Sequence, residues 1–170
     1  DDSDCVISPP GRQMMPDRGG PAKWRGRPGT LNIRRVLRPA TAMTWMVSRE
    51  HPLRGVLGGA DACAYENRYL VGTPDEFEVT LAAHAQLPAG GVMAYQNGGG
   101  SGFGPAIRRD PHKVLDDVLD EFVSIEAARD VYGVVLNGTL ENYDLVVDEA
   151  ATLALRAKMA NDDQQVEAAE

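Results

Sequence analysis

This 170-residue sequence has few of the residues that usually form cross-links or carry chemistry. It contains 2 cysteines, 3 histidines and only 6% aromatic residues. Two thiols cannot build a disulfide framework, and we expect both to be reduced, with a disulfide between them only in an oxidising compartment. No apolar run approaches the ~20 residues that cross a bilayer, so we expect no membrane partner. The acidic, polar start lacks the features of a signal peptide, which favours a cytoplasmic location. Because the sequence lacks a starting methionine, we expect a processed, trimmed or incomplete product.

The residue types that bind metals or act as nucleophiles are scattered. Cys5, His51, Cys63, His84 and His112 show none of the short pairwise spacings typical of zinc sites. No serine or cysteine lies in a recognisable nucleophile elbow. We therefore predict no catalytic residue, no metal site and no cofactor on this chain.

Charge is distributed unevenly along the sequence. Residues 1–56 hold ten Lys and Arg against five Asp and Glu, whereas residues 110–170 hold four against fifteen. The basic residues of the first third are dispersed, without a helical stripe or interleaved stacking aromatics. We therefore expect no nucleic-acid partner, and interpret the basic third as a surface that faces either an acidic partner subunit or solvent.

Residues 97–133 carry the densest local signals. Five glycines fall within seven residues: Gly98, Gly99, Gly100, Gly102 and Gly104. Backbone amides in such a loop can cradle a phosphate. The loop lacks the Gly-Lys-Ser/Thr ending of a P-loop, however, and does not open directly into a helix. We interpret it as a structural turn in which backbone packs against backbone.

Two helices are predicted after the glycine loop. Asp110 is a favourable N-cap and Pro111 suits the first helical position, which predicts a helix over 111–122. Ser124 can cap a second helix over 125–132, which Gly133 can close in the left-handed conformation. The acidic side chains of the first helix are expected to face solvent: Asp116, Asp117, Asp120 and Glu121.

The remaining patterns predict an α+β fold, with an irregular, mostly antiparallel β region followed by short helices. Alternating residues predict strands over 30–38 and 41–49 that pair with each other, and further strands over 77–87 and 92–97. A small hairpin is expected around Asn137-Gly138. Asp148 can cap a third helix over 149–160, which Asn161 can end.

These patterns divide the chain into three parts. Residues 1–29 are rich in Gly, Pro and Arg, and we expect an extended arm that docks on a partner subunit through Trp24 and Arg25. Residues 30–160 form the α+β domain. Residues 161–170 are expected to be a disordered acidic tail.

Several motifs resemble the C-terminal end of the hydantoinase B family. They are GGGSGFG at 98–104, the basic-Asp-Pro step at 109–111, VSIEAARDVYGVV at 123–135 and, upstream, DRGGPAKWRG at 17–26. The chain departs from the family pattern at Ala60, where a third glycine is usual. It departs again at residues 95–97, where the family commonly has an acid-like residue and Thr-Pro. Substrate specificity is therefore not carried over.

The resemblance implies a small structural subunit of a heteromeric ATP-dependent enzyme. It implies a hydantoinase A-like partner that binds ATP and a B-like large subunit, with ATP and a divalent metal (Mg or Mn) bound in those partners. The reaction implied is ketone carboxylation, as in acetone or acetophenone carboxylases, or opening of a cyclic amide such as hydantoin or 5-oxoproline. The alternative is a non-enzymatic scaffold or binding protein that docks through its basic N-terminal arm.

Overall fold

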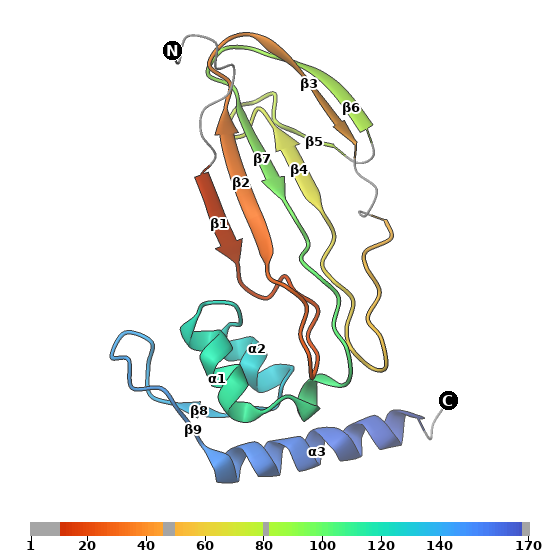
Figure 1. The fold of residues 1–170 in the computed structure, drawn as a ribbon, viewed down its shortest axis with the longest axis vertical. Helices are drawn as coiled ribbons and strands as arrows, with labels where there is room; N and C mark the ends of the chain where they lie inside the picture. Colours follow the sequence, from red (N-terminus) through yellow and green to blue (C-terminus); the bar gives the residue numbers. More distant parts are fainter. Residues whose placement is uncertain (1–10, 46–49, 80–81, 168–170) are drawn as a thin grey trace.

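The computed structural model describes residues 11–45, 50–79 and 82–167. It confirms the α+β class. A mostly antiparallel β region forms the upper part of the molecule, and the helices lie together below it (Figure 1). Long loops connect the two parts.

The main sheet has five strands, all antiparallel to their neighbours. Their order across the sheet is β1 (Gly11–Met15), β2 (Gly29–Arg35), β7 (Val92–Gln96), β4 (Glu66–Tyr69) and β5 (Phe77–Val79). Strand β7 lies at the centre, and Gln96 is opposite Leu31 on one side and Glu66 on the other. The chain therefore enters the glycine loop directly from the middle of the sheet.

A separate two-stranded ribbon, β3 (Ala40–Trp45) and β6 (Ala82–Leu87), packs against the main sheet. Side chains from both layers bury one another, and the Thr44 and Tyr69 hydroxyls are hydrogen-bonded between them. This upper core consists of Val36, Tyr69, Val79, Ala85, Leu87 and Met93. The apolar residues of the ribbon thus supply the second layer that a single sheet needs in order to bury its face.

Two of the predicted strand arrangements are wrong. The strands over 30–38 and 41–49 do not pair, because β2 pairs with β1 and β7 whereas β3 pairs with β6. Residues 46–49 lie outside the described residues. The single strand predicted over 77–87 is two strands, β5 and β6, in different sheets. Alternation predicts that a segment is extended, but the pairing partner is chosen by packing between segments distant in sequence.

The helical part begins as predicted. After a single 3-10 turn (Ala106–Arg108), α1 spans Pro111–Leu119 and α2 spans Ile125–Asp130. The Asp110 carboxylate accepts a hydrogen bond from the His112 amide at 2.9 Å, and the Ser124 hydroxyl accepts one from the Ala127 amide at 3.0 Å. Both predicted caps are confirmed.

A small hairpin completes the lower core. Strands β8 (Leu136–Asn137) and β9 (Val146–Val147) pair antiparallel around Gly138, which has a φ of 101°. A hairpin at this place is confirmed, but Asn137 lies in β8, and residues 138–145 connect the strands in place of the tight Asn137-Gly138 turn that was predicted. The lower core that the hairpin and the helices bury consists of Val114, Val118, Val123, Ala128, Tyr132, Val134 and Leu145.

Helix α3 (Glu149–Glu167) runs along the base of the molecule (Figure 1). The Asp148 carboxylate caps it by accepting from the Ala151 amide at 2.9 Å, and this bond lowers the pKa of Asp148. The helix continues past Asn161 to Glu167, where a disordered tail was expected. Asn costs well under 1 kcal/mol relative to Ala within a helix, and no Gly or Pro follows it before Glu167. No helix in the described part of the chain is long and apolar enough to cross a membrane.

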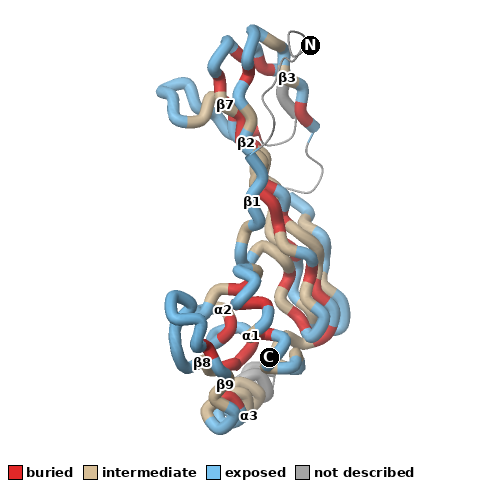
Figure 2. The backbone as a smooth tube through the Cα atoms, turned by 60° about the vertical axis from the view of Figure 1, so that its left-hand side comes forward, coloured by how far each residue is buried: buried red, intermediate tan, exposed pale blue. Residues whose placement is uncertain are grey.

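The described part of the N-terminal arm is built into the fold. Residues 11–15 form β1, and the following residues run between the sheet and the helices (Figure 1). The Asp17 amide donates to the Phe122 carbonyl at 3.1 Å, and the Asp17 carboxylate accepts from the Ser124 amide at 2.9 Å. Figure 2 shows buried backbone where the loops meet, between the sheet and the helices.

Candidate functional site

The glycine loop packs against the N-terminal arm through backbone hydrogen bonds. The Gly20 amide donates to the Gly100 carbonyl at 2.8 Å, and the Gly100 amide donates to the Arg27 carbonyl at 2.9 Å. A Cβ at Gly26 would lie 1.8 Å from the Gly100 oxygen, and one at Gly98 would lie 1.6 Å from the Cys63 oxygen. Only glycine permits this approach, so the loop fixes three distant segments against one another.

The other three glycines of the loop extend this packing toward its surface. Gly99 and Gly104 have φ values of 83° and 77°, which other residues rarely adopt. A Cβ at Gly102 would lie 2.5 Å from the Cβ of Ala22. All five predicted loop glycines therefore lie in the same contact region.

A three-segment ladder forms at the surface of this loop. Trp24 and Phe103 exchange two backbone hydrogen bonds of 3.0 Å, and Phe103 also bridges Val56 on its other side. Directly opposed residues on neighbouring extended segments place their side chains on the same face. Glycine packing thus gathers apolar side chains from positions 24, 56 and 103.

The gathered side chains remain exposed. Trp24 is 56% exposed, Phe103 48%, Val56 51% and the adjacent Leu57 73%. We call these four residues the apolar patch. Isolated exposed apolar residues are common, but a contiguous group usually marks an interaction site. The predicted docking residue Trp24 is therefore accessible and has apolar neighbours.

A basic cleft lies beside Trp24. The ammonium nitrogen of Lys23 is 5.9 Å from the centre of the indole ring, and that of Lys113 is 5.5 Å from it. The cleft has a volume of about 470 Å³. It is lined by Lys23, Trp24, Arg108, Arg109, Asp110, Pro111, Lys113 and Arg156.

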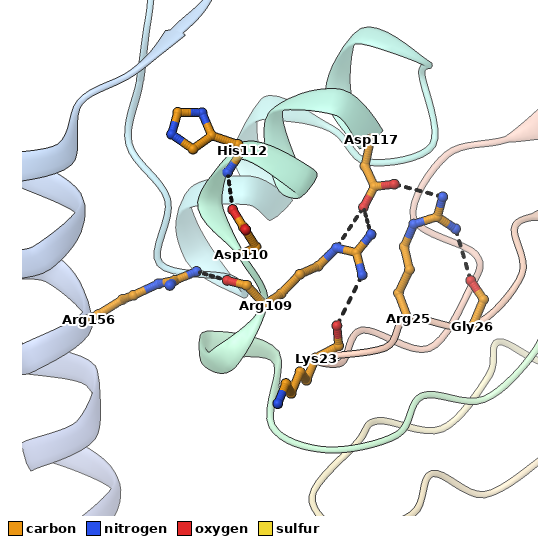
Figure 3. Close-up of polar contacts among 8 residues, drawn as sticks. All are labelled: Lys23, Arg25, Gly26, Arg109, Asp110, His112, Asp117 and Arg156. Atoms are coloured by element: carbon orange, nitrogen blue, oxygen red, sulfur yellow. Dashed lines mark hydrogen bonds and ion pairs between the residues drawn. The ribbon is translucent and has the colours of Figure 1, made fainter.

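Beneath the cleft, two arginines hold one buried carboxylate (Figure 3). Arg25 Nη2 lies 2.8 Å from Asp117 Oδ1, and Arg109 Nη2 lies 2.8 Å from Asp117 Oδ2. The Arg109 Nε also donates to Oδ2 at 2.9 Å. The side chains of Arg25, Arg109 and Asp117 are only 15%, 11% and 8% exposed. This clamp joins the arm, the segment after the glycine loop and helix α1.

Arg25 is therefore engaged inside the chain, in contrast to the exposed Trp24 beside it. Its Nη1 also donates to the Gly26 carbonyl at 3.0 Å, and its guanidinium lies 4.9 Å from the centre of the Phe122 ring. Asp117 was predicted to face solvent, and that prediction is wrong. It lies three residues after Val114 and one before Val118, so helical spacing places it beside the buried face.

Arg156 connects helix α3 to the same region. Its Nη2 donates to the Arg109 carbonyl at 2.7 Å and its Nε donates to the Tyr132 carbonyl at 3.1 Å. Burial lowers the pKa of Arg156 and raises the pKa of Tyr132. The lower helices and the cleft thus form one connected unit.

The histidines and cysteines that could bind a metal lie apart from the apolar patch and the basic cleft. The exception is His112, which lies between the cleft residues Pro111 and Lys113 in the sequence. His51 and His84 are exposed. His112 is also exposed, and its Nε2 lies 3.0 Å from Glu149 Oε1. Cys63 is a free thiol, and Cys5 lies outside the described residues. Among the described residues, no three His, Cys, Asp or Glu side chains are grouped as metal ligands would be.

A family model described as hydantoinase B/oxoprolinase matches residues 10–106, which is more than half of the sequence. The chain belongs to this family. The matched segment contains residues 10–29 of the arm, the main sheet, the ribbon of β3 and β6 and the glycine loop, so the family assignment covers most of the elements that build the candidate site.

Two curated relatives extend the likeness beyond the matched segment. The caprolactamase subunit beta of Pseudomonas jessenii is 32% identical over 85% of this chain and 25% of its own length. The acetone carboxylase alpha subunit of Xanthobacter autotrophicus is 28% identical over 89% of this chain and 24% of its own length. The hydantoinase B-family chain therefore spans about a quarter of these relatives.

Two solved structures share the fold. The ATP-dependent caprolactamase from Pseudomonas jessenii superposes with a TM-score of 0.69 and 28% identity, covering 89% of this chain and 26% of its own. A nucleotide-free acetone carboxylase gives a TM-score of 0.77 over 94% of this chain and 25% of its own. The identity to the latter is 24%, so that likeness concerns the fold alone.

Proposed function

We propose that this chain is a structural part of a heteromeric, ATP-dependent enzyme of the hydantoinase B type. The supporting observation is its likeness, over 85% and 89% of its length, to chains that are named subunits of caprolactamase and acetone carboxylase. The likeness covers only about a quarter of each relative's own length. The chain would complete the fold and the interface of a B-type large subunit, and an A-type subunit would join the complex.

The reaction that we propose for the complex is ATP-dependent opening of a cyclic amide. The greater identity to the caprolactamase subunit favours this choice, at 32% against 28% for the carboxylase subunit. Ketone carboxylation is the second candidate, supported by the acetone carboxylase likeness. In either reaction ATP would activate an oxygen of the substrate or of bicarbonate, and the partner subunits would bind ATP and a divalent metal such as Mg or Mn.

Within that enzyme, the residues of this chain would have a structural role. The clamp at Asp117 and the glycine loop hold the arm against the helices, and this keeps the apolar patch in one position. We propose no catalytic role for these residues. A cytoplasmic location is part of the same proposal, since ATP must be available to the complex.

Native mass spectrometry of the untagged protein from its source tests the proposal. We expect a complex with two larger chains in fixed stoichiometry, and phosphate release from ATP that depends on an added substrate. Caprolactam, hydantoin, 5-oxoproline and acetone are the substrates to compare. A folded monomer of 18.3 kDa with no larger partner would contradict the proposal and favour a non-enzymatic scaffold.

A further inference from the structure

The apolar patch and the basic cleft form one continuous surface, in which Arg109, Asp110 and Arg156 have partners inside the chain while Trp24 and Phe103 are exposed. Trp24 belongs to both, because it opposes Phe103 in the ladder and also lines the cleft. The backbone beneath is held by glycine contacts and hydrogen bonds, so the surface is preorganised. A rigid surface loses little conformational entropy on binding.

We propose that this surface binds the part of a hydantoinase B-type subunit that has no counterpart in this chain. The proposal rests on the proposed function and adds the contact surface and its chemistry. The bound region would place an apolar side chain against Trp24 and Phe103, and carboxylates against Lys23 and Lys113.

The charges favour an acidic partner. Within the described residues, Lys23, Arg108 and Lys113 form no ion pair with a carboxylate. Three like charges around one cleft repel one another, and partner carboxylates would relieve that repulsion. Carboxylates at the edge of an apolar contact would also fix its orientation.

The lengths of the relatives favour, as the binding partner, the region of a B-type subunit that has no counterpart in this chain. The caprolactamase and acetone carboxylase subunits have about three quarters of their length outside the likeness. A region of that size can cover a patch and a cleft built from three chain segments. In the relatives this contact would lie within a single polypeptide.

A second copy of this chain is a poorer partner. In a two-fold symmetric contact the same surface meets itself. Lys23 and Lys113 of one copy would then face the same lysines of the other, with only Asp110 among the cleft residues to offset them. Like charges opposed across a contact suppress association.

Competition between chains in the native complex tests this contact. Wild-type and variant chains of different mass are co-expressed in the source organism. Their ratio in the purified complex is then compared with their ratio in the cell extract by intact mass spectrometry. Trp24→Ala should enter the complex roughly 30-fold less than wild type, the loss expected for a central aromatic contact. Its side chain is 56% exposed, so the isolated variant should keep its far-UV circular dichroism.

Two matched controls are available in the same chain. Trp45 is 72% exposed on the distant ribbon, and Trp45→Ala should enter at the wild-type ratio. Reversal of both cleft lysines, Lys23→Glu with Lys113→Glu, should reduce entry at least tenfold. Lys158→Glu, a reversal of an exposed lysine on α3 that does not line the cleft, should not.

The outcomes separate this proposal from the one on which it rests. A wild-type complex that accepts Trp24→Ala at the wild-type ratio, or excludes Trp45→Ala equally, would overturn the assigned surface and leave the subunit role intact. A wild-type chain found only as a monomer would overturn both. A wild-type dimer of this chain that Trp24→Ala dissociates would show that the surface binds a second copy instead.

Discussion

Replacing Asp117 with alanine should destabilise the protein strongly, because one carboxylate holds two arginines. The Arg25 and Arg109 side chains are 15% and 11% exposed, so water would solvate them poorly after the change. Removing one partner of a buried ion pair typically costs about 3–5 kcal/mol. The arginines would keep bonds to the Gly26 and Lys23 carbonyls, which favours the lower end of that range.

A loss of about 3 kcal/mol should lower the melting temperature by roughly 6–12 °C in a chain of this size. Thermal and urea denaturation followed by circular dichroism measures it. Asp116→Ala is the matched control, because Asp116 is the preceding carboxylate on α1 and is exposed. It should change the free energy of unfolding by no more than about 0.5 kcal/mol.

A double-mutant cycle tests whether the lost stability comes from the contact between Arg25 and Asp117. Arg25→Ala combined with Asp117→Ala should be less destabilising than the two single changes added together, by about 1 kcal/mol or more, because the pair interacts directly. If Asp117→Ala is as stable as Asp116→Ala, the clamp does not hold the arm to α1.

Three further changes test other parts of the fold. Gly26→Ala should prevent stable folding, since its Cβ would lie 1.8 Å from the Gly100 oxygen. Gly11→Ala is the control and should fold, because the nearest atom to its Cβ would be 3.9 Å away. Soluble yield and circular dichroism show whether each variant folds. Burial raises the pKa of Tyr95 from 10.0 to about 12, so stability should hold below pH 10 and fall as the pH rises from 10 to 12, because the unfolded chain then loses a proton that the folded chain keeps. Tyr95→Phe should reduce that fall in urea titrations. Ser124→Ala removes the cap of α2 and should cost about 1 kcal/mol in the same assay.

The helical part of the fold could be predicted closely because its signals are local. The caps at Asp110, Ser124 and Asp148 are set by contacts to amides two or three residues away. Gly133 takes a φ of 62°, as a glycine after a helix commonly does. Each of these features depends on a few neighbouring residues, which the sequence shows directly.

The sheet could be predicted only in part, as separate strands, and its strands β1 and β4 were not predicted. Strand β7 leads into the glycine loop and pairs with β2 and β4. Both of these strands precede β7 in the sequence, and other strands lie between them and β7. No turn signal specifies such pairings. Their choice depends on which faces bury one another, and here the ribbon of β3 and β6 supplies the covering layer.

In the candidate site, two adjacent residues for which the sequence predicts one role have different roles in the structure. Trp24 and Arg25 are adjacent, and both were predicted to contact a partner. In an extended segment, successive side chains point to opposite faces. Trp24 therefore joins Phe103 at the surface, while Arg25 turns inward to Asp117. The inward position depends on a carboxylate 92 residues further along, so the sequence alone could not separate the residue that holds the arm from the one available to a partner.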